Sequence, residues 1–464
     1  MPILVLLGQV ARADTLQQIF DLSLARDPQI RAAEAQLRAA QSGRALGRAG
    51  LLPQLSLAAN YTDTRIRGDA ANTDAQSDSA SATLDQALFD LPAWYVYRQG
   101  DARAKQAEQD YLAAQQNLII RATRRYFQVL DALDSLAATK AEEVALASQL
   151  NQARQRHRAG GVAITDVHEA QAAYDDVVAR LLDAQAGVGI AFEGLRVLTG
   201  QNHLQVAPLR GDFPIAEPEP VSAQAWVDKA LAGSFALKGA ALARDAARYN
   251  AQSKKWEHLP SLSLRLSHAE NSGERAFGGM PVNQDVGTSS LTLNLQAPLY
   301  LGGAVSAGRR QARHQYLAAE ESLNQVQRTL VQDTRSQHLR VGTKVAEVRA
   351  RHQAVISSQS AYEATRAGYR AGTRNLVDLL AAEQALYRAR RNYTGTRYAY
   401  ILDLFRLNEL AGSLRAQHIR DIDDWLDPTA PLPRSLVERS GPGLPLPAPM
   451  VPVERENGGE DGAE

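Results

Sequence analysis

Leu52-Pro53-Gln54-Leu55-Ser56-Leu57 recurs 207 positions later as Leu259-Pro260-Ser261-Leu262-Ser263-Leu264. Further matched stretches follow in the same order, and their offset grows by only five residues along the chain. These stretches are Leu88-Phe89-Asp90 with Leu299-Tyr300-Leu301, Arg158-Ala159-Gly160-Gly161 with Arg370-Ala371-Gly372-Thr373, and Leu198-Thr199-Gly200 with Leu410-Ala411-Gly412. An ordered series of this kind predicts that the chain is built from two copies of one structural unit.

The repeat predicts the domain organisation. The first unit covers residues 14–206 and the second covers 223–412, and a Pro-rich acidic linker at 207–222 joins them. Residues 413–464 form a further segment, which is Pro-rich and then Gly- and Glu-rich after Pro428, and we expect its last twenty or so residues to be disordered. Each unit reads as a helix, two strands, a very long helix, a turn and a returning helix.

Residues 1–13 read as a secretory signal peptide. The apolar run Ile3 to Leu7 is followed by Ala11-Arg12-Ala13, a small-x-small cleavage pattern that comes just before Asp14. The run is short and no Lys or Arg precedes it. The alternative is therefore a buried first turn of a helix.

Apolar and polar residues alternate with a period of two after Pro53 and again after Pro260, which predicts strands. Each stretch of about 9 to 11 residues has the length of a tilted membrane-spanning strand with one apolar and one small polar face. The polar segments Asp63–Ser77 and Ala269–Gly287 read as surface loops between paired strands. A soluble sandwich with short hairpins is the alternative. The residues expected on the shared apolar face are Leu55, Leu57, Ala59, Tyr61, Ala80, Ala82, Leu84, Gln86, Leu88, Leu262, Leu264, Leu266, Leu291, Leu293, Leu295 and Ala297.

Two segments predict unusually long helices, since Ala93–His157 and Ala304–Tyr369 contain no Pro and few Gly. At 1.5 Å per residue each would be about 100 Å long. The shorter helices Leu16–Arg48 and Ile164–Leu198 together match one long helix, and Ala223–Trp256 begins the same arrangement in the second unit. Two short helices can therefore stack end to end beside each long one. Coiled-coil spacing is shown by Leu112, Ile119, Tyr126 and Leu133, and by Ala122, Val129 and Leu136.

Four strands per chain cannot close a barrel, because the smallest membrane barrels use about eight. Three chains would supply twelve strands. We therefore expect a mixed α and β fold in a homotrimer, with a twelve-stranded membrane β-barrel, four strands per protomer, continued by a long α-helical coiled-coil barrel.

Composition and motifs exclude several function classes. Lys plus Arg and Asp plus Glu both number 51, so no excess charge would hold a nucleic acid. The chain has no Cys and no HExxH, P-loop, GxGxxG or GxSxG motif, so we expect no cofactor, no metal and no enzyme. The acid pairs Asp131 with Asp134 and Asp175 with Asp176 read as solvated helix faces.

The turns between the paired helices have related sequences: Gly161 to Val167 reads GVAITDV, and Tyr369 to Leu380 reads YRAGTRNLVDLL. These turns resemble those of the TolC family of outer-membrane channel-tunnels. The resemblance covers about Asp14 to Gly412, and it implies an outer-membrane protein whose helical part lies in the periplasm.

In this family the turns form a periplasmic entrance that is closed by links between inner and outer hairpins. The resemblance implies that Asp166 pairs with Arg374 and Tyr369 as a latch, with Thr165 beside them. The residues that would form the two hairpin turns are Gly160, Gly161, Gly372 and Thr373. The plain alternative is that Thr165 or Asp166 caps the returning helix.

Asp378 would lie just inside the mouth, in an acidic ring across three chains. The family pattern has a second acidic residue three positions on, where this sequence has Ala381. The single ring implies weaker discrimination in favour of cations.

The resemblance further implies an exit duct of a tripartite export system, surrounded by outer-membrane lipid. A periplasmic adaptor would dock at the hairpin tips, and an inner-membrane ABC transporter would supply the energy. The cargo would be a protein such as an RTX-type toxin, through type I secretion, or small molecules, through a multidrug efflux pump. The absence of a lipid-acceptor Cys favours protein secretion, because drug-pump ducts of this family are often lipoproteins. A coiled-coil scaffold that spans the envelope without a pore is an alternative of a different class.

Overall fold

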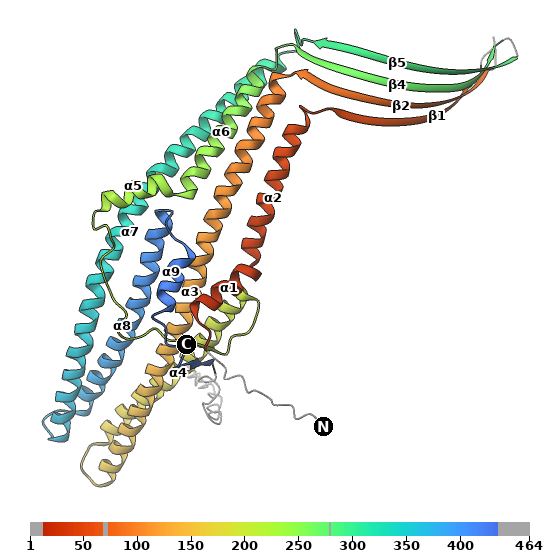
Figure 1. Ribbon diagram of the computed structural model, residues 1–464. Helices are drawn as coiled ribbons and strands as arrows, with labels where there is room; N and C mark the ends of the chain where they lie inside the picture. The colour runs from red at the N-terminus through yellow and green to blue at the C-terminus, as the bar shows by residue number, and fades with distance from the viewer. Residues whose placement is uncertain (1–12, 68–72, 278–279, 435–464) are drawn as a thin grey trace, which may run out of the picture.

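The computed structural model describes residues 13–67, 73–277 and 280–434, and it shows a long rod of helices with a curved sheet at one end (Figure 1). The first unit contains α1 (Leu16–Arg26), α2 (Pro28–Ala49), β1 (Gln54–Ile66), β2 (Thr73–Phe89), α3 (Leu91–Arg158) and α4 (Ile164–Thr199). The second unit contains α5 (Ala223–Gly233), α6 (Phe235–Lys255), β4 (Ser261–Phe277), β5 (Met280–Gln296), α7 (Ala304–Arg370) and α8 (Leu376–Leu410). The end of the first unit adds β3 (Gln205–Val206), and the last described segment adds α9 (Ala416–Asp423) and β6 (Leu432–Pro433). The predicted signal peptide, apart from Ala13, and the predicted disordered tail lie outside the described residues.

The long helices set the length of the rod. α3 has 68 residues and α7 has 67, in agreement with the lengths predicted from the absence of Pro. In the first unit α2 and α4 lie one after the other along α3, and in the second α6 and α8 lie along α7 (Figure 1). Over the described ranges, none of the helices combines the length and the apolar character needed to cross a membrane.

The shorter helix that leads into each strand pair is broken once. Asp27 ends α1 and begins α2, because its side chain accepts hydrogen bonds from the amides of Gln29 and Ile30, both at 2.9 Å. The second break, at Ser234, was not predicted, since 223–256 was read as one helix. It exists because Ser234 caps α6 and because Gly233 packs against the end of α8, where a side chain would overlap the carbonyl oxygen of Ala411.

Four long strands form one antiparallel sheet in the order β1-β2-β4-β5, and the short strands β3 and β6 pair in a separate sheet. The register of the four-stranded sheet places Leu55 opposite Leu84, Leu84 opposite Leu266, and Leu266 opposite Leu291. The apolar side chains of the four strands therefore share one face, as the two-residue period predicts. Leu88 is an exception, because a register shift after Ala87 places Phe89 opposite Leu262 in its stead. In the chain as described, β1 and β5 are the edge strands, and each has one side without a partner strand.

The strands are longer than predicted. β1 has 13 residues and β2, β4 and β5 have 17 each, so much of the predicted loops 63–77 and 269–287 is strand. Thr62 still faces Ser77, and Asn271 still faces Val286. Backbone groups make the ladder hydrogen bonds, so polar side chains do not end the pairing. The loop prediction was wrong because it took polarity as a sign of irregular structure.

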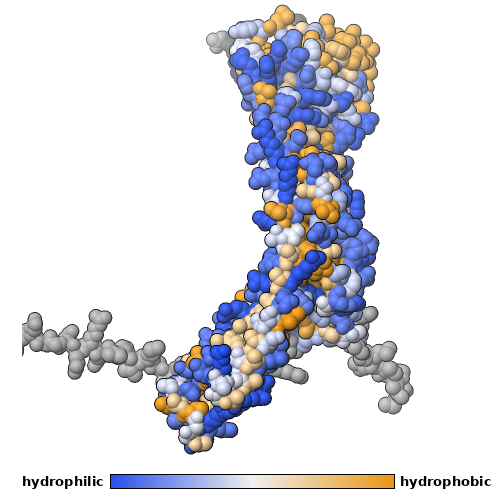
Figure 2. All heavy atoms as spheres, turned by 90° about the vertical axis from the view of Figure 1, so that its left-hand side faces the viewer, coloured by the Kyte–Doolittle hydropathy of each residue, from blue (hydrophilic) through white to orange (hydrophobic). Residues whose placement is uncertain are grey.

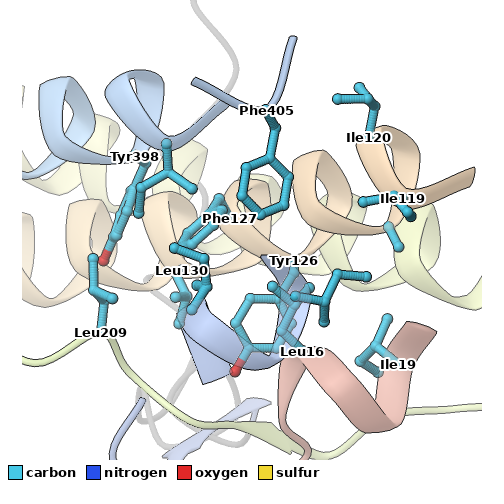
Figure 3. Close-up of a cluster of buried hydrophobic side chains, with 14 of the residues drawn as sticks. Leu16, Ile19, Ile119, Ile120, Tyr126, Phe127, Leu130, Leu209, Tyr398 and Phe405 are labelled. Carbon is cyan, nitrogen blue, oxygen red and sulfur yellow. The ribbon is translucent and has the colours of Figure 1, made fainter. Parts of the chain in front are cut away.

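The largest buried cluster lies partway along the rod, where α1, α3, α8 and the linker meet (Figure 3). Tyr126 and Phe127 are fully buried there, and Phe127 stacks on Tyr398 with 5.1 Å between ring centroids. The Tyr126 hydroxyl donates a hydrogen bond of 2.7 Å to the carbonyl of Ala207, which fastens the linker to α3. Most of the positions with coiled-coil spacing are buried, as that spacing predicts. They are Ile119, Ala122, Tyr126, Val129, Leu133 and Leu136.

Candidate functional site

The two hairpin turns lie at the end of the rod opposite the sheet (Figure 1). Gly160 and Gly372 have φ angles of 73° and 76°, a region that favours glycine, and each one ends a long helix. The amide of Gly161 donates to the carbonyl of Arg156 at 2.8 Å, and the Thr373 amide donates to that of Gly368 at 2.9 Å. The four residues predicted to form the turns therefore do so.

The two hairpins pack against each other close to these turns. Leu146, Leu150 and Val177 of the first hairpin form a buried cluster with Leu376 and Leu380 of the second. Tyr369 packs at the edge of this cluster. The apolar cluster fixes the relative position of the two tips, since its members come from both hairpins.

A cation–π contact also joins the tips. The guanidinium of Arg156, in the last turn of α3, lies 5.0 Å from the ring centroid of Tyr369. Sequence reasoning had singled out Tyr369 but not Arg156. The only available sign was the run of basic residues at the end of α3, which is also common where a helix simply ends.

Arg374 and Asp378 lie together at the start of the second returning helix. One guanidinium nitrogen of Arg374 is 3.6 Å from a carboxylate oxygen of Asp378, and both side chains are exposed. The side chain of Asn375 accepts a hydrogen bond of 2.8 Å from the Asp378 amide and so caps α8. Ion pairs as exposed as this one contribute about 0–1 kcal/mol, so Arg374 can readily exchange partners.

Thr165 and Asp166 lie in the first turn of α4. This helix begins after Ala163, which gives no side-chain cap, so the capping role considered for Thr165 and Asp166 is wrong. Asp166 is half-buried, and the start of a helix favours its negative charge. For the described residues of this single chain, no ion pair joins Asp166 to Arg374.

Above the tips, a buried group of charges ties the two hairpins together. The Glu142 carboxylate is fully buried and accepts hydrogen bonds of 2.8 and 3.1 Å from Arg180 of α4. Arg391 of α8 donates to it as well, at 3.3 Å. Sequence reasoning missed this group, because Glu142 lies outside the heptad positions and its partners are far away in the chain.

A second buried carboxyl group lies on α8. Burial raises the pKa of Glu383, and the negative charge of Glu142 acts in the same direction. Hydrogen bonds from Tyr362 and Gln149 oppose this effect. Glu383 is therefore more easily protonated than an exposed glutamate.

The two acid pairs that were read as solvated faces differ from each other. Asp175 and Asp176 are exposed, as predicted. Asp134 is not simply solvated, because the Tyr398 hydroxyl donates a hydrogen bond of 2.6 Å to it and burial raises its pKa. The prediction failed for Asp134 because its partner comes from the other repeat. Across the residues that can be described, no group of His, Asp and Glu is suited to holding a metal ion.

Known proteins share this arrangement of helices, strands and turns. The family described as outer membrane efflux protein matches residues 19–201 and 226–413, one match in each repeat. Over 422 residues the chain is 35% identical to outer membrane protein TolC of Vibrio cholerae, and the match covers 90% of this chain and 95% of that protein. The chain belongs to the TolC family.

Two further TolC-family comparisons concern secretion and fold. Alkaline protease secretion protein AprF of Pseudomonas aeruginosa is 31% identical over 89% of this chain and 87% of its own length. The CmeC outer membrane channel of Campylobacter jejuni has the same fold, with a TM-score of 0.74 at 18% identity, over 89% of this chain and 90% of that one. The fold class predicted from the sequence is thus confirmed.

Membership settles the coarse function. TolC-family proteins are outer-membrane channels of export systems, and they are not enzymes. The protein is therefore an outer-membrane channel whose helical tunnel extends into the periplasm, so the sheet end of the rod is the membrane end. A scaffold without a pore does not agree with this membership.

Proposed function

We propose that this protein is the exit duct of a type I system that secretes a protein, of the kind represented by RTX-type toxins. The observation that carries the proposal is the 31% identity to a protein named for alkaline protease secretion, which extends over 89% of the chain. The resemblance of the two hairpin turns to the namesake branch of the family supports the same cargo class.

The assembly that we propose is a homotrimer in which β1 of one protomer pairs with β5 of the next. Edge strands with a free side of 13 and 17 residues support this pairing, because unpaired backbone groups inside a membrane cost several kcal/mol each. Leu57 and Leu295 lie on the exposed apolar face and would contact outer-membrane lipid. A periplasmic adaptor would dock at the hairpin tips and connect the duct to an inner-membrane ABC transporter.

The entrance in this proposal is closed by the predicted latch. Arg374 would exchange its weak partner Asp378 for Asp166 when three chains bring the tips together, with Tyr369 and Thr165 alongside. The exposed 3.6 Å pair supports such an exchange, because little energy is lost when it breaks. Asp378 would then face the mouth as a single acidic ring, since Ala381 offers no second one.

Small-molecule efflux is the second candidate function. The matching family is described as outer membrane efflux protein, and the fold of this chain is also that of the CmeC channel. Because the duct is passive in both systems, the two systems would differ mainly in the adaptor and the transporter that dock at its tips.

A complementation experiment separates the two cargo classes. The full chain is expressed in a host that lacks its own outer-membrane channel but carries a protease-secreting ABC transporter with its adaptor, and in a second host that carries only a drug pump. We expect the protease to appear in the medium of the first host. Restored drug resistance without any secreted protease would replace this proposal with the efflux function, and an empty vector is the control.

A further inference from the structure

An exposed apolar segment connects the sheet to the second long helix. Leu299 and Tyr300 are 96% and 84% exposed, and Leu301 beside them is also exposed. These residues follow β5 and lead into α7, at the end of the molecule that carries the sheet, where Figure 2 shows hydrophobic residues gathered. Three adjacent large apolar side chains in this position indicate a surface that is covered in the working protein.

Basic side chains surround this segment. Arg309, Arg310 and Arg313 of α7 line one concave surface with Leu299, Tyr300 and Leu301, and Lys255 at the end of α6 lies on the same surface. All four of these cations are exposed. No hydrogen bond or ion pair to an acidic side chain is found for the three arginines within the described part of the chain. No Asp or Glu occurs in the sequence between Asp285 and Glu320, so the positive charge has no nearby compensation along the chain.

The corresponding junction of the first repeat shows that this charge is not a general feature of the fold. Leu88, Phe89 and Trp94 are exposed there as well. At the offset of 211 positions that relates Leu88 to Leu299, Arg309, Arg310 and Arg313 correspond to Arg98, Gln99 and Ala102, so the first repeat has one of the three cations. The two junctions thus share an apolar surface, and only the second adds a cluster of three arginines to it.

The position of this surface identifies what it faces. The sheet end lies in the outer membrane and the helices lie in the periplasm, so the β5–α7 junction lies at the periplasmic face of the membrane. Phosphate groups are the anions present at that depth, and Arg binds phosphate through two parallel hydrogen bonds. Tyr and Leu side chains prefer the boundary between headgroups and acyl chains.

We propose that the β5–α7 junction is a binding site for an anionic phospholipid of the periplasmic leaflet. Arg309, Arg310 and Arg313 hold the headgroup phosphate, while Leu299 and Tyr300 contact the upper acyl chain. The site selects lipids with a net negative headgroup, because three arginines and no acidic side chain line its surface. It anchors the second repeat to the membrane surface more strongly than the first junction does, because the first junction has one arginine where the second has three.

The test uses the assembly extracted from outer membranes with a mild detergent. Fluorescent phosphatidylglycerol or phosphatidylcholine is added, and the lipid that remains bound after washing is measured. The variant carries Arg309→Gln, Arg310→Gln and Arg313→Gln. The matched control carries Arg328→Gln, Arg340→Gln and Arg349→Gln, which removes the same charge from exposed positions farther along α7.

We expect the first variant to retain at least roughly tenfold less phosphatidylglycerol than the unaltered protein, because each cation near an anionic surface contributes about a fivefold change in affinity. The control and the binding of phosphatidylcholine should change by less than about twofold. Equal retention by variant and control would overturn the proposal. Displacement of the lipid by millimolar inorganic phosphate would reduce the site to one for free anions. Loss of the oligomer in the first variant alone would show that a second copy of the chain covers the surface instead.

Discussion

Arg391 of α8 lies 3.3 Å from the buried carboxylate of Glu142 in α3, so an ion pair inside the rod joins the hairpins of the two repeats. Arg180 of α4 binds the same carboxylate from within the first hairpin. A single acidic side chain therefore pairs with two cations that come from different units. Its removal would leave both arginines partly buried and without this counter-charge.

Glu142→Gln should lower the free energy of unfolding by about 3 kcal/mol, since breaking a buried ion pair costs far more than breaking an exposed one. Urea unfolding followed by far-UV circular dichroism measures this change. Glu169→Gln is the control, because Glu169 is exposed on α4. Equal urea midpoints of unfolding for the two variants would mean that the buried ion pair does not stabilise the packing of the two hairpins.

Glu383→Gln should raise the melting temperature at pH 7 and leave it unchanged near pH 4. Burial raises the pKa of Glu383 in the folded protein. A group of this kind contributes stability below its unfolded pKa of about 4.5, and that contribution is lost as the pH rises through the folded value. Thermal melts of both proteins across this pH range test the prediction. A variant less stable at pH 7 would show that the hydrogen bonds from Tyr362 and Gln149 outweigh the desolvation of the charge.

Gly233→Ala should destabilise the protein by about 1–3 kcal/mol, because the added methyl group would overlap the carbonyl oxygen of Ala411 at the end of α8. Gly342→Ala is the matched control, since nothing lies within 4 Å of the position that its methyl group would take. In a helix interior that control should be neutral or slightly stabilising. Comparable losses in both variants would argue against close packing at the α5–α6 break.

Asp166→Ala combined with Arg374→Ala should raise the single-channel conductance in planar lipid bilayers, because the latch would no longer hold the entrance closed. A latch of this kind contributes about 1–3 kcal/mol per protomer, which a docking partner can overcome. Arg158→Ala removes one charge from an exposed site next to the first turn and serves as the control. Conductance equal to that of the unaltered channel would remove the latch from the mechanism.

The repeat and the periodicities predicted most of the fold. The period-two runs after Pro53 and Pro260 located the strands and their apolar face, and the absence of Pro located α3 and α7. The break at Ser234 escaped because it depends on contact with Ala411, which is distant in the sequence. The strand ends were not predicted for a related reason. The pairing of β4 with β5 is made by backbone groups, and the polarity of the side chains does not reveal it.

The candidate site was less accessible to sequence reasoning. Gly160 and Gly372 occur at matching positions of the two repeats, so the sequence located the tips, and both glycines have positive φ in the structure. The Arg156 contact with Tyr369 and the charges around Glu142 join residues of different repeats. Such pairs leave no local pattern, because each partner alone looks like an ordinary charged residue on a helix.

The unpaired edges of β1 and β5 affect how the protomer behaves before it assembles. Each edge strand can pair with any extended polypeptide, and the exposed Leu-rich face of the sheet favours aggregation in water. Before insertion, copies of the same chain therefore have to compete with other extended polypeptides for these two edges.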